Sequence, residues 1–431
     1  MNIWKNPGLE NLRNKLKEVP VLSTDCCIFR VPKRLREGNE KAYTPQVVSI
    51  GPLHHGEKGL ESIEEHKIRY VRDFVERTKV NIDECFNTLK QWEARIRGYY
   101  AVTIEYSQHE LVEMILVDGI FTLEVLLRGS FETLQKKNDR IFGLMHRDIM
   151  YDMLLLENQL PFFVLEYLLS LAYATSFFPM EHDRAHVSGH FLIKLTHSFF
   201  KDRVYIRPLD EIICKIGQYP ESRRILHFVD FLLKCHRPPP FDPPPKSILQ
   251  TLTIPSATEL HQAGVKFMMV KDKNFFDIQF DNGILKIPQL RIRGSSEVFF
   301  RNLIAYEQCE LTEFDDHYIN DYIFIMDRLV DSAKDVELLL QKKILDSKLS
   351  DKDKVANFIS SLNSGPVVFS KKFYYIDLCE KLNEYYEVPW HKWKASLIHD
   401  YFSSPWAVLS VIAAVVLLVL TFVQTVFSVM Y

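Results

Sequence analysis

Glycine is scarce in this chain, with 15 residues among 431. A low glycine content disfavours phosphate-binding loops and long meandering β folds, because both need backbone conformations that glycine adopts most easily. Aromatic residues are plentiful instead, with 30 phenylalanines and 19 tyrosines, and they indicate a bulky helical core. The net charge of -3 gives no support to nucleic-acid binding, which usually needs a clearly basic surface.

Paired cysteine motifs are also missing, since none of the seven cysteines forms a CxxC pair. Scattered cysteines in a long chain are typical of reduced, buried thiols and not of a disulfide framework. The neighbouring pairs Cys26-Cys27 and His54-His55 match common zinc-ligand spacing poorly. We therefore expect no metal site and no cofactor.

No catalytic motif is present: the chain lacks GxSxG, Walker A, GxGxxG and HExxH patterns. His146-Arg147-Asp148 spells the HRD of a kinase catalytic loop. A kinase also needs an asparagine five residues after the aspartate, where this chain has Met153, and it needs a glycine-rich loop. The sequence therefore predicts no catalytic residues and a protein that is not an enzyme.

Charge is absent from the last thirty residues, from Phe402 to Tyr431. Within them Trp406 to Phe427 would rise roughly 33 Å as a helix, enough to cross a bilayer core of about 30 Å. We therefore predict one transmembrane helix over residues 405–429. The side chains expected to anchor it in the lipid bilayer are Trp406, Leu409, Val411, Val415, Leu417, Leu418, Leu420 and Phe422.

The charged N-terminus lacks the apolar core of a signal peptide, and the charges beside the predicted span lie on its N-terminal side. They include Lys392 and Lys394, so the positive-inside tendency places the body in the cytoplasm. We expect a single-pass, tail-anchored membrane protein, with the plasma membrane and an endomembrane both open. A buried hydrophobic C-terminal helix is the alternative.

The rest of the chain predicts a mainly α fold, a large multi-helix globular body with one small β-hairpin element. Four segments precede the predicted span: an N-terminal amphipathic segment at 1–27, a helical half at 28–236, a proline-rich linker at 237–253 and a C-terminal half at 254–400. The linker contains RPPPFDPPPK, which must be extended. A semi-rigid spacer is the simpler interpretation, and a ligand for an aromatic-grooved module is the alternative.

Apolar periodicity places the individual elements. Helices are expected at 57–78, 81–98, 106–128, 186–200, 222–235, 296–310, 318–345, 352–364 and 371–400, with two buried helices joined at 157–160. Alternation on both sides of Asp281-Asn282-Gly283 predicts a β-hairpin over 275–293.

Several polar residues lie in strongly apolar sequence, where burial is costly unless they are paired. They are Asp118, Glu124, Glu157, Asn158 and Gln159. We interpret them as a buried polar network, in which Lys67 or Arg69 could pair with Asp118. The functional alternative is a set of acids with raised pKa in a cleft.

The chain resembles the plant family named for domain of unknown function 247. The matching segments are Ile28–Pro32, Tyr43–Gly56, Glu65–Tyr70, Val117–Leu126, Asp152–Glu166, Ile254–Phe267, Asn282–Ile292 and Phe300–Gln308, followed by the YF..PW entry to the predicted span. This resemblance implies a family that is largely uncharacterised and whose members commonly end in one predicted transmembrane helix. Some grass members are associated with pollen self-incompatibility. It supplies no established catalytic residues.

The leading hypothesis is a membrane-anchored, non-enzymatic interaction or signalling protein that binds an unidentified protein partner and no nucleic acid. One alternative is an enzyme with an unrecognised acidic site around Asp118 and Glu157. Another is a self-incompatibility determinant in pollen recognition. The oligomeric state stays open.

Overall fold

The computed structural model describes residues 23–135, 140–174, 187–201, 224–238, 254–271, 276–310, 317–349, 351–363, 373–388 and 405–430, with a few single positions between them. Most of the predicted amphipathic segment 1–27 and of the proline-rich linker 237–253 lies outside these residues. The chain divides into two compact units, Met1–Cys235 with Arg301–Glu310, and His236–Phe300 with Leu311–Tyr431. The predicted N-terminal half ended at 236, beside the boundary after Cys235, but the return of 301–310 to unit 1 was not predicted.

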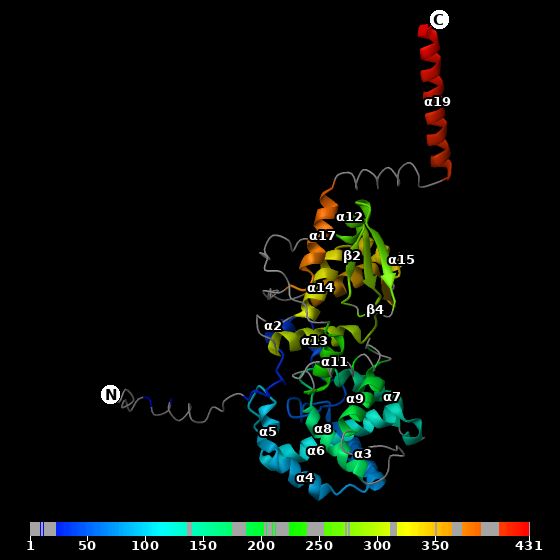
Figure 1. Ribbon diagram of the computed structural model, residues 1–431. Coiled ribbons are helices and arrows are strands. Elements are labelled where there is room, and N and C mark those ends of the chain that lie inside the picture. Colours follow the sequence, from blue (N-terminus) through cyan, green and yellow to red (C-terminus); the bar gives the residue numbers. More distant parts are fainter. Residues whose placement is uncertain are drawn as a thin grey trace. The chain divides into compact units, whose positions relative to one another are not determined.

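Unit 1 is helical and is built around one central helix, α6 (Gln108–Ser130). Ser107 begins it with a capping box, in which its side chain accepts from the Glu110 amide and Glu110 accepts from the Ser107 amide. Apolar side chains occur all round α6, as in a helix buried on every face. It packs against α3, α4, α8 and α9, which surround it in Figure 1.

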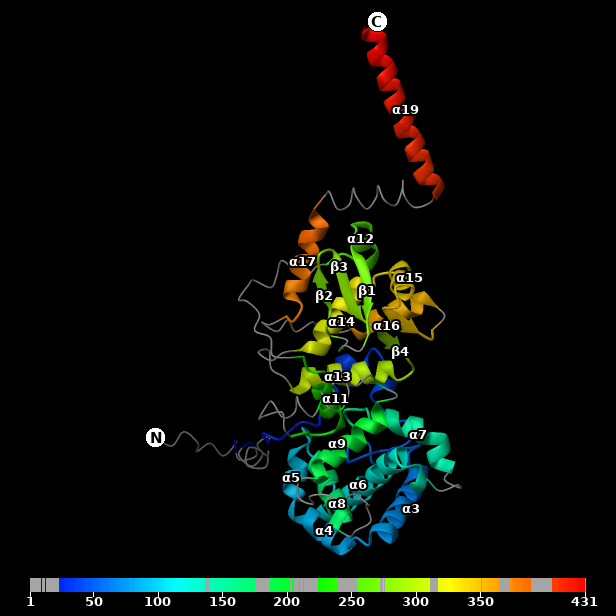
Figure 2. The same cartoon turned by 45° about the vertical axis from the view of Figure 1, so that its right-hand side comes forward.

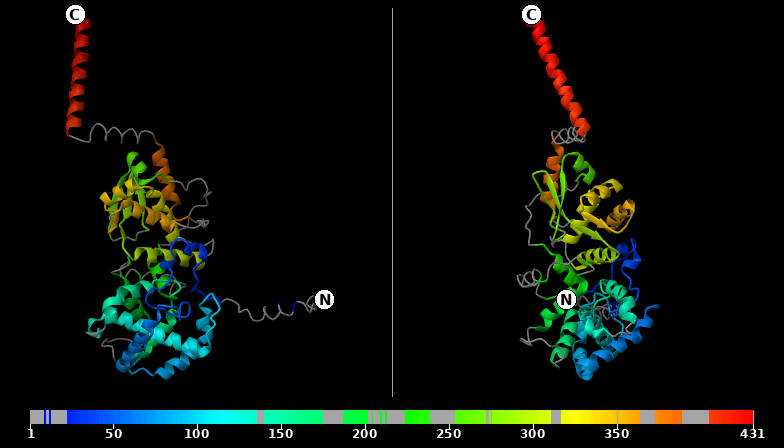
Figure 3. Two further views of the ribbon diagram at one scale, coloured as in Figure 1. Left: turned by 180° about the vertical axis from the view of Figure 1, so that it is seen from behind. Right: turned by 90° about the vertical axis from the view of Figure 1, so that its right-hand side faces the viewer.

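The remaining elements of unit 1 are short or peripheral. They are α2 (Lys33–Arg36), η2 (Glu40–Ala42), α3 (Glu61–Thr78), α4 (Ile82–Gln91), α5 (Glu93–Gly98), η3 (Glu132–Leu134), α7 (Arg140–Asp152), α8 (Phe162–Ala174), α9 (Val187–Phe200) and most of α11 (Phe228–His236). Figure 3 shows this helical unit from two further directions. The two helices predicted on either side of 157–160 are α7 and α8, joined by a buried turn. α8 is largely buried as predicted, whereas α7 exposes Met145, Arg147 and Asp148.

Unit 2 combines a small sheet with helices. Its elements are α12 (Ala257–Gln262), β1 (Lys266–Val270), β2 (Gln279–Asp281), β3 (Ile284–Pro288), β4 (Leu290–Ile292), the start of α13 (Ser296–Glu310), α14 (Tyr318–Leu329), α15 (Ala333–Gln341), β5 (Leu345–Ser347), α16 (Lys352–Leu362), α17 (Ile376–Glu387) and α19 (Pro405–Met430). The strand order is β1-β3-β2, seen as adjacent arrows in Figure 2. β3 runs parallel to β1 and antiparallel to β2.

The hairpin within 275–293 is shorter than the sequence predicts. β2 and β3 meet across Asn282-Gly283, whose φ angles of 50° and 75° are the left-handed values that such a turn needs. The predicted second strand breaks after Pro288, because proline has no amide to donate to a ladder. β4 follows and pairs with β5 in a separate parallel sheet.

The single helix predicted over 318–345 is wrong, because α14 ends at Leu329 and α15 starts a new helix. Ser332 and Asp335 form a capping box at that start, so the chain supplies its own new helix N-terminus. The end of the predicted helix, Leu345–Ser347, is strand β5.

The prediction of a transmembrane helix over 405–429 is also wrong. α19 forms, but no helix in the described part of the chain is long and apolar enough to cross a membrane. Of the predicted anchor residues, Leu409, Val415, Leu417, Leu418, Leu420 and Phe422 are exposed, and the side chains of Trp406 and Val411 lie outside the description.

The close approach of α6 and α8 generates a prediction. A Cβ at Gly119 would lie 2.7 Å from Leu168 Cδ1, so Gly119→Leu should lower the free energy of unfolding by about 1–3 kcal/mol through overpacking. Gly143 in α7 has no atom within 4 Å of such a Cβ, so Gly143→Ala should instead stabilise by about 0.5–1 kcal/mol. Urea unfolding of the two variants checks this, and equal effects would contradict the packing.

Candidate functional site

A largely buried segment without regular secondary structure runs through unit 1, and we call residues 46–53 the buried loop. Gln46 at its start is exposed, Val47 is partly exposed and residues 48–53 are buried. Val48, Ile50 and Leu53 are almost fully inaccessible. A buried backbone needs partners for its amides and carbonyls, and a neighbouring strand would usually supply them. Here polar side chains from α6, α7, α3 and the turn after α7 supply them.

Asp152, the last residue of α7, binds the start of the buried loop. Its carboxylate accepts from the amides of Gln46, Val47 and Val48 at 2.9, 2.7 and 2.8 Å. Burial raises the pKa of Asp152 to about 6, and the three amides oppose that rise. One side chain therefore satisfies three successive backbone donors.

Asn158 joins the loop to the turn after α7, and Gln159 holds that turn together. The Asn158 carboxamide oxygen accepts from the Ile50 amide at 2.6 Å, and its nitrogen donates to the carbonyls of Val48 and Asp152. The Gln159 nitrogen donates to the carbonyls of Met153 and Leu155, while its oxygen accepts from the Phe228 amide. The side-chain carboxamides of these two residues therefore stabilise the turn by bonding its backbone carbonyls.

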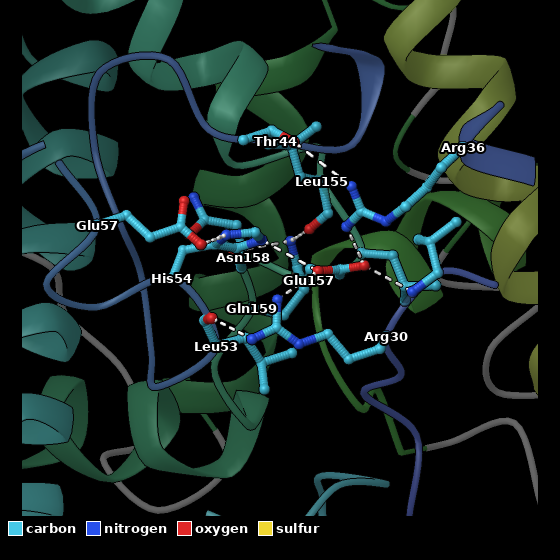
Figure 4. Close-up of polar contacts among 12 residues, drawn as sticks. Arg30, Arg36, Thr44, Leu53, His54, Glu57, Leu155, Glu157, Asn158 and Gln159 are labelled. Atoms are coloured by element: carbon cyan, nitrogen blue, oxygen red, sulfur yellow. Dashed lines mark hydrogen bonds and ion pairs between the residues drawn. The ribbon is translucent and has the colours of Figure 1, made fainter. Parts of the chain in front are cut away.

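Glu157 is the centre of the charged part of the network, shown in Figure 4. Its carboxylate accepts from Arg36, from Arg30 Nη1 at 2.9 Å and from the Val31 amide at 2.6 Å. His54 Nε2 lies 3.1 Å away, and His54 Nδ1 lies 2.8 Å from Glu57. Burial favours the neutral acid, but donation from His54, Val31 and Arg36 outweighs it and lowers the pKa of Glu157 to about 2.

Asp118 holds the end of the buried loop. One of its oxygens accepts from the Gly51 amide at 2.8 Å, and the other lies 2.6 Å from Lys67 Nζ. Lys67 Nζ also donates to the Ser49 carbonyl at 2.7 Å and pairs with Glu64. Burial opposes the charge on Lys67, but the carboxylates of Asp118 and Glu64 raise its pKa above the usual value.

Gly51 marks the tightest point of the loop. Its φ of +76° is left-handed, and a Cβ there would lie 2.8 Å from the Gln159 carbonyl oxygen. Any other residue would clash with backbone at this position.

Glu124 belongs to a separate ion cluster on α6. It accepts from Arg77 and from Arg128 Nε, the latter at 3.0 Å. Arg128 also pairs with Asp73 at 2.8 Å and lies over the Tyr70 ring at 3.9 Å from its centroid. This cluster fixes α6 to α3.

Of the five predicted network residues, Asp118 and Asn158 bind the buried loop directly. Glu157 binds Val31 and two arginines, Gln159 binds the turn after α7 and the Phe228 amide, and Glu124 lies in a separate cluster. Lys67 is the partner of Asp118, whereas Arg69 pairs with Glu65 at the surface. The sequence analysis did not assign Arg30, Arg36, His54 or Asp152 to the network. For Asp152 a signal existed, since it is a carboxylate in the apolar run DIMYDMLLL.

His54-His55 was also considered as part of a metal site with Cys26-Cys27. In the described residues no group of three His, Cys, Asp or Glu side chains is arranged to hold a metal ion. His54 instead lies between two carboxylates, those of Glu57 and Glu157.

An open cavity of about 440 Å³ lies beside this network, between α3, α6 and the loop at His55, and we call it the acidic hollow. Its carboxylates are Glu64, Glu65, Glu110, Glu113 and Asp118. Ile68, Met114 and Val117 give it apolar surface, and the rings of His55 and Tyr106 meet edge to face at one end. Cavities of this size take side chains or small ligands.

Comparison with known proteins gives one family. The model of DUF247, described as a plant protein of unknown function, matches residues 28–420. The UPF0481 protein At3g47200 of Arabidopsis thaliana is 30% identical, over 93% of this chain and 85% of that protein. The putative UPF0481 protein At3g02645 of the same plant is 25% identical, over 98% of this chain and 93% of its own length. No solved structure matches.

The environment of Glu157 predicts a pH-dependent contribution to stability. Its folded pKa of about 2 lies below the ordinary 4.5, so its stabilisation is complete above pH 4.5 and is lost as the pH falls toward 2. Glu157→Gln should therefore lower the free energy of unfolding by about 3 kcal/mol near neutral pH, and by progressively less in acid. Urea unfolding at several pH values measures this. The control Glu57→Gln alters a half-exposed carboxylate and should change stability by less than about 1 kcal/mol. A pH-independent effect of Glu157→Gln would contradict the account.

The pair Lys67–Asp118 predicts a non-additive result. Lys67→Met leaves a buried carboxylate without its cation and should cost about 3–5 kcal/mol. Adding Asp118→Asn removes that charge while keeping an acceptor for the Gly51 amide, so the double variant should be more stable than Lys67→Met alone. A loss in the double variant equal to the sum of the two single losses would show that the pair is not coupled.

Proposed function

We propose a binding function for this chain, which belongs to the DUF247 family of plant proteins of unknown function. The resemblance noted in the sequence is thereby confirmed. In this proposal the chain is a non-enzymatic protein-interaction or signalling component, and unit 1 provides the surface that a protein partner contacts. The observation that carries the proposal is the contrast between the buried network and the acidic hollow beside it.

The buried acids are engaged in holding backbone and side chains in place. Asp152 binds three amides, Glu157 binds two arginines and an amide, and Glu124 binds two arginines. A general acid or base has to reach a proton on a substrate, and these carboxylates face protein donors instead. This arrangement supports a structural role for them.

The enzyme alternative needed Asp118, Glu124 and Glu157 to converge in one cleft. Of these three acids, Asp118 borders the acidic hollow, while Glu124 and Glu157 lie in two other clusters. Asp118 itself is held by Lys67 and by the Gly51 amide. The separation of the acids therefore favours binding over catalysis.

The acidic hollow has the composition of a binding surface. Ile68 on α3 is 54% exposed at its edge, next to carboxylates that are open to solvent. An exposed aliphatic side chain beside a cavity of ligand size marks a place that a partner can cover. No observation here separately favours the pollen-recognition alternative, which would also be a binding function.

The test compares the proteins that co-purify with three tagged full-length chains expressed in plant tissue. Ile68→Trp fills the edge of the hollow without changing charge, and Glu76→Trp places the same bulk at an exposed position farther along α3. We expect at least one reproducible partner of the wild-type chain to fall about tenfold with Ile68→Trp and to be retained with Glu76→Trp. Circular dichroism establishes that both variants are folded. An identical set of partners for all three chains would contradict the proposal.

A further inference from the structure

We propose that the acidic hollow binds an arginine-bearing, basic segment of the protein partner. This inference rests on the binding function proposed above and adds the chemistry of the partner. Three observations carry it: the charge of the hollow, its apolar surface, and the pair of rings in its lining.

The first observation is an excess of negative charge. Five carboxylates border the hollow, and no lysine or arginine does. Lys67 beneath it is shared by Glu64 and Asp118, and Arg69 outside it pairs with Glu65. Five negative groups against these two cations leave an excess of about three negative charges when histidine is neutral. Such a cavity attracts cations and repels nucleic acid and other polyanions.

The exposed carboxylates on the two sides of the hollow are the ones available to a partner. Glu113 on α6 lies 3.8 Å from His109 Nδ1, and both side chains are exposed. Glu65 on α3 pairs with an exposed arginine, and such surface pairs contribute little and exchange readily with water. A guanidinium entering between α3 and α6 can therefore bind carboxylates from both helices.

The second observation is the apolar surface, which distinguishes a side chain from a simple ion. Ile68, Met114 and Val117 lie between the carboxylates. Arginine and lysine bury an aliphatic stem on such a surface while the charged group reaches polar partners. A small inorganic cation would leave this surface uncovered.

The third observation concerns the ring-lined end and favours arginine over lysine. Tyr106 donates its hydroxyl to the His55 carbonyl at 3.1 Å, which fixes the two rings at 5.8 Å between centroids. His55 Nδ1 is buried and has no hydrogen-bond partner among the described residues. A planar guanidinium can stack on the exposed part of such a ring pair, which an ammonium group cannot do.

The first experiment is an unbiased selection of peptides. A displayed library of random dodecapeptides is selected on the folded full-length chain after depletion on Glu65→Lys/Glu113→Lys, which reverses charge on both sides of the hollow. We expect the surviving peptides to be enriched in arginine next to apolar residues. Survivors without enrichment in basic residues, or no survivors, would overturn the inference.

The second experiment measures affinity for the best selected peptide by fluorescence anisotropy. Glu65→Lys/Glu113→Lys should weaken binding by about tenfold or more, and replacing the peptide's arginines with citrulline should have a similar effect. The matched control Glu76→Lys/Glu84→Lys makes the same charge change at exposed positions outside the hollow and should stay within about twofold. Equal weakening by both double variants would overturn the inference, because binding would then follow net charge alone.

The two proposals fail in different ways. If Ile68→Trp removes a cellular partner but the selected peptides are not basic, the binding function stands and the arginine-bearing partner is wrong. If Ile68→Trp and Glu76→Trp leave the same partners in place, the binding function itself is wrong, whatever the peptides show.

Discussion

The fold of unit 1 depends on how the backbone of the buried loop is hydrogen-bonded. Polar side chains bind its amides and some of its carbonyls, as a neighbouring strand would in a sheet. Asp152, Asn158 and Asp118 bind five of its amides, and Lys67 binds the Ser49 carbonyl. A buried amide or carbonyl left without a partner costs about 1–3 kcal/mol. With this many groups on one short segment, the loop and its polar side chains must become ordered together.

The same network determines the wall of the acidic hollow. The chain leaves the buried loop at Leu53 and passes directly to His54 and His55. His54 lies between Glu57 and Glu157, so it is held on both sides, while the next residue borders the hollow. Asp118 and Glu64 take part in both features through Lys67. The buried acids therefore contribute to binding indirectly, by fixing the surface that a partner would contact.

Sequence reasoning reached the mainly helical architecture because apolar periodicity is a local property. α3 and α4 each have an apolar stripe, α6 and α8 are long apolar runs, and Asn282-Gly283 has turn chemistry that can be read directly. It also located most of the network, since a carboxylate or amide within an apolar run must find a partner. It did not pair Asp152 with Gln46, because the two are 106 positions apart and no local pattern connects them. The same limit hid Arg30 and Arg36 as partners of Glu157.

The transmembrane prediction rested on uncharged length alone, and the described part of α19 does not provide a helix that can cross a membrane.

Hydrogen exchange at the buried loop tests the central claim most directly. The claim is that the amides of Val47, Val48, Ile50 and Gly51 are held by side chains as firmly as amides within a helix. The account predicts that they exchange as slowly as amides in the middle of α6, although they lie in no helix or strand, and that Asp152→Ala releases Val47 and Val48 before Gly51. Exchange of these amides at the rate of an exposed loop in the wild-type chain would contradict it.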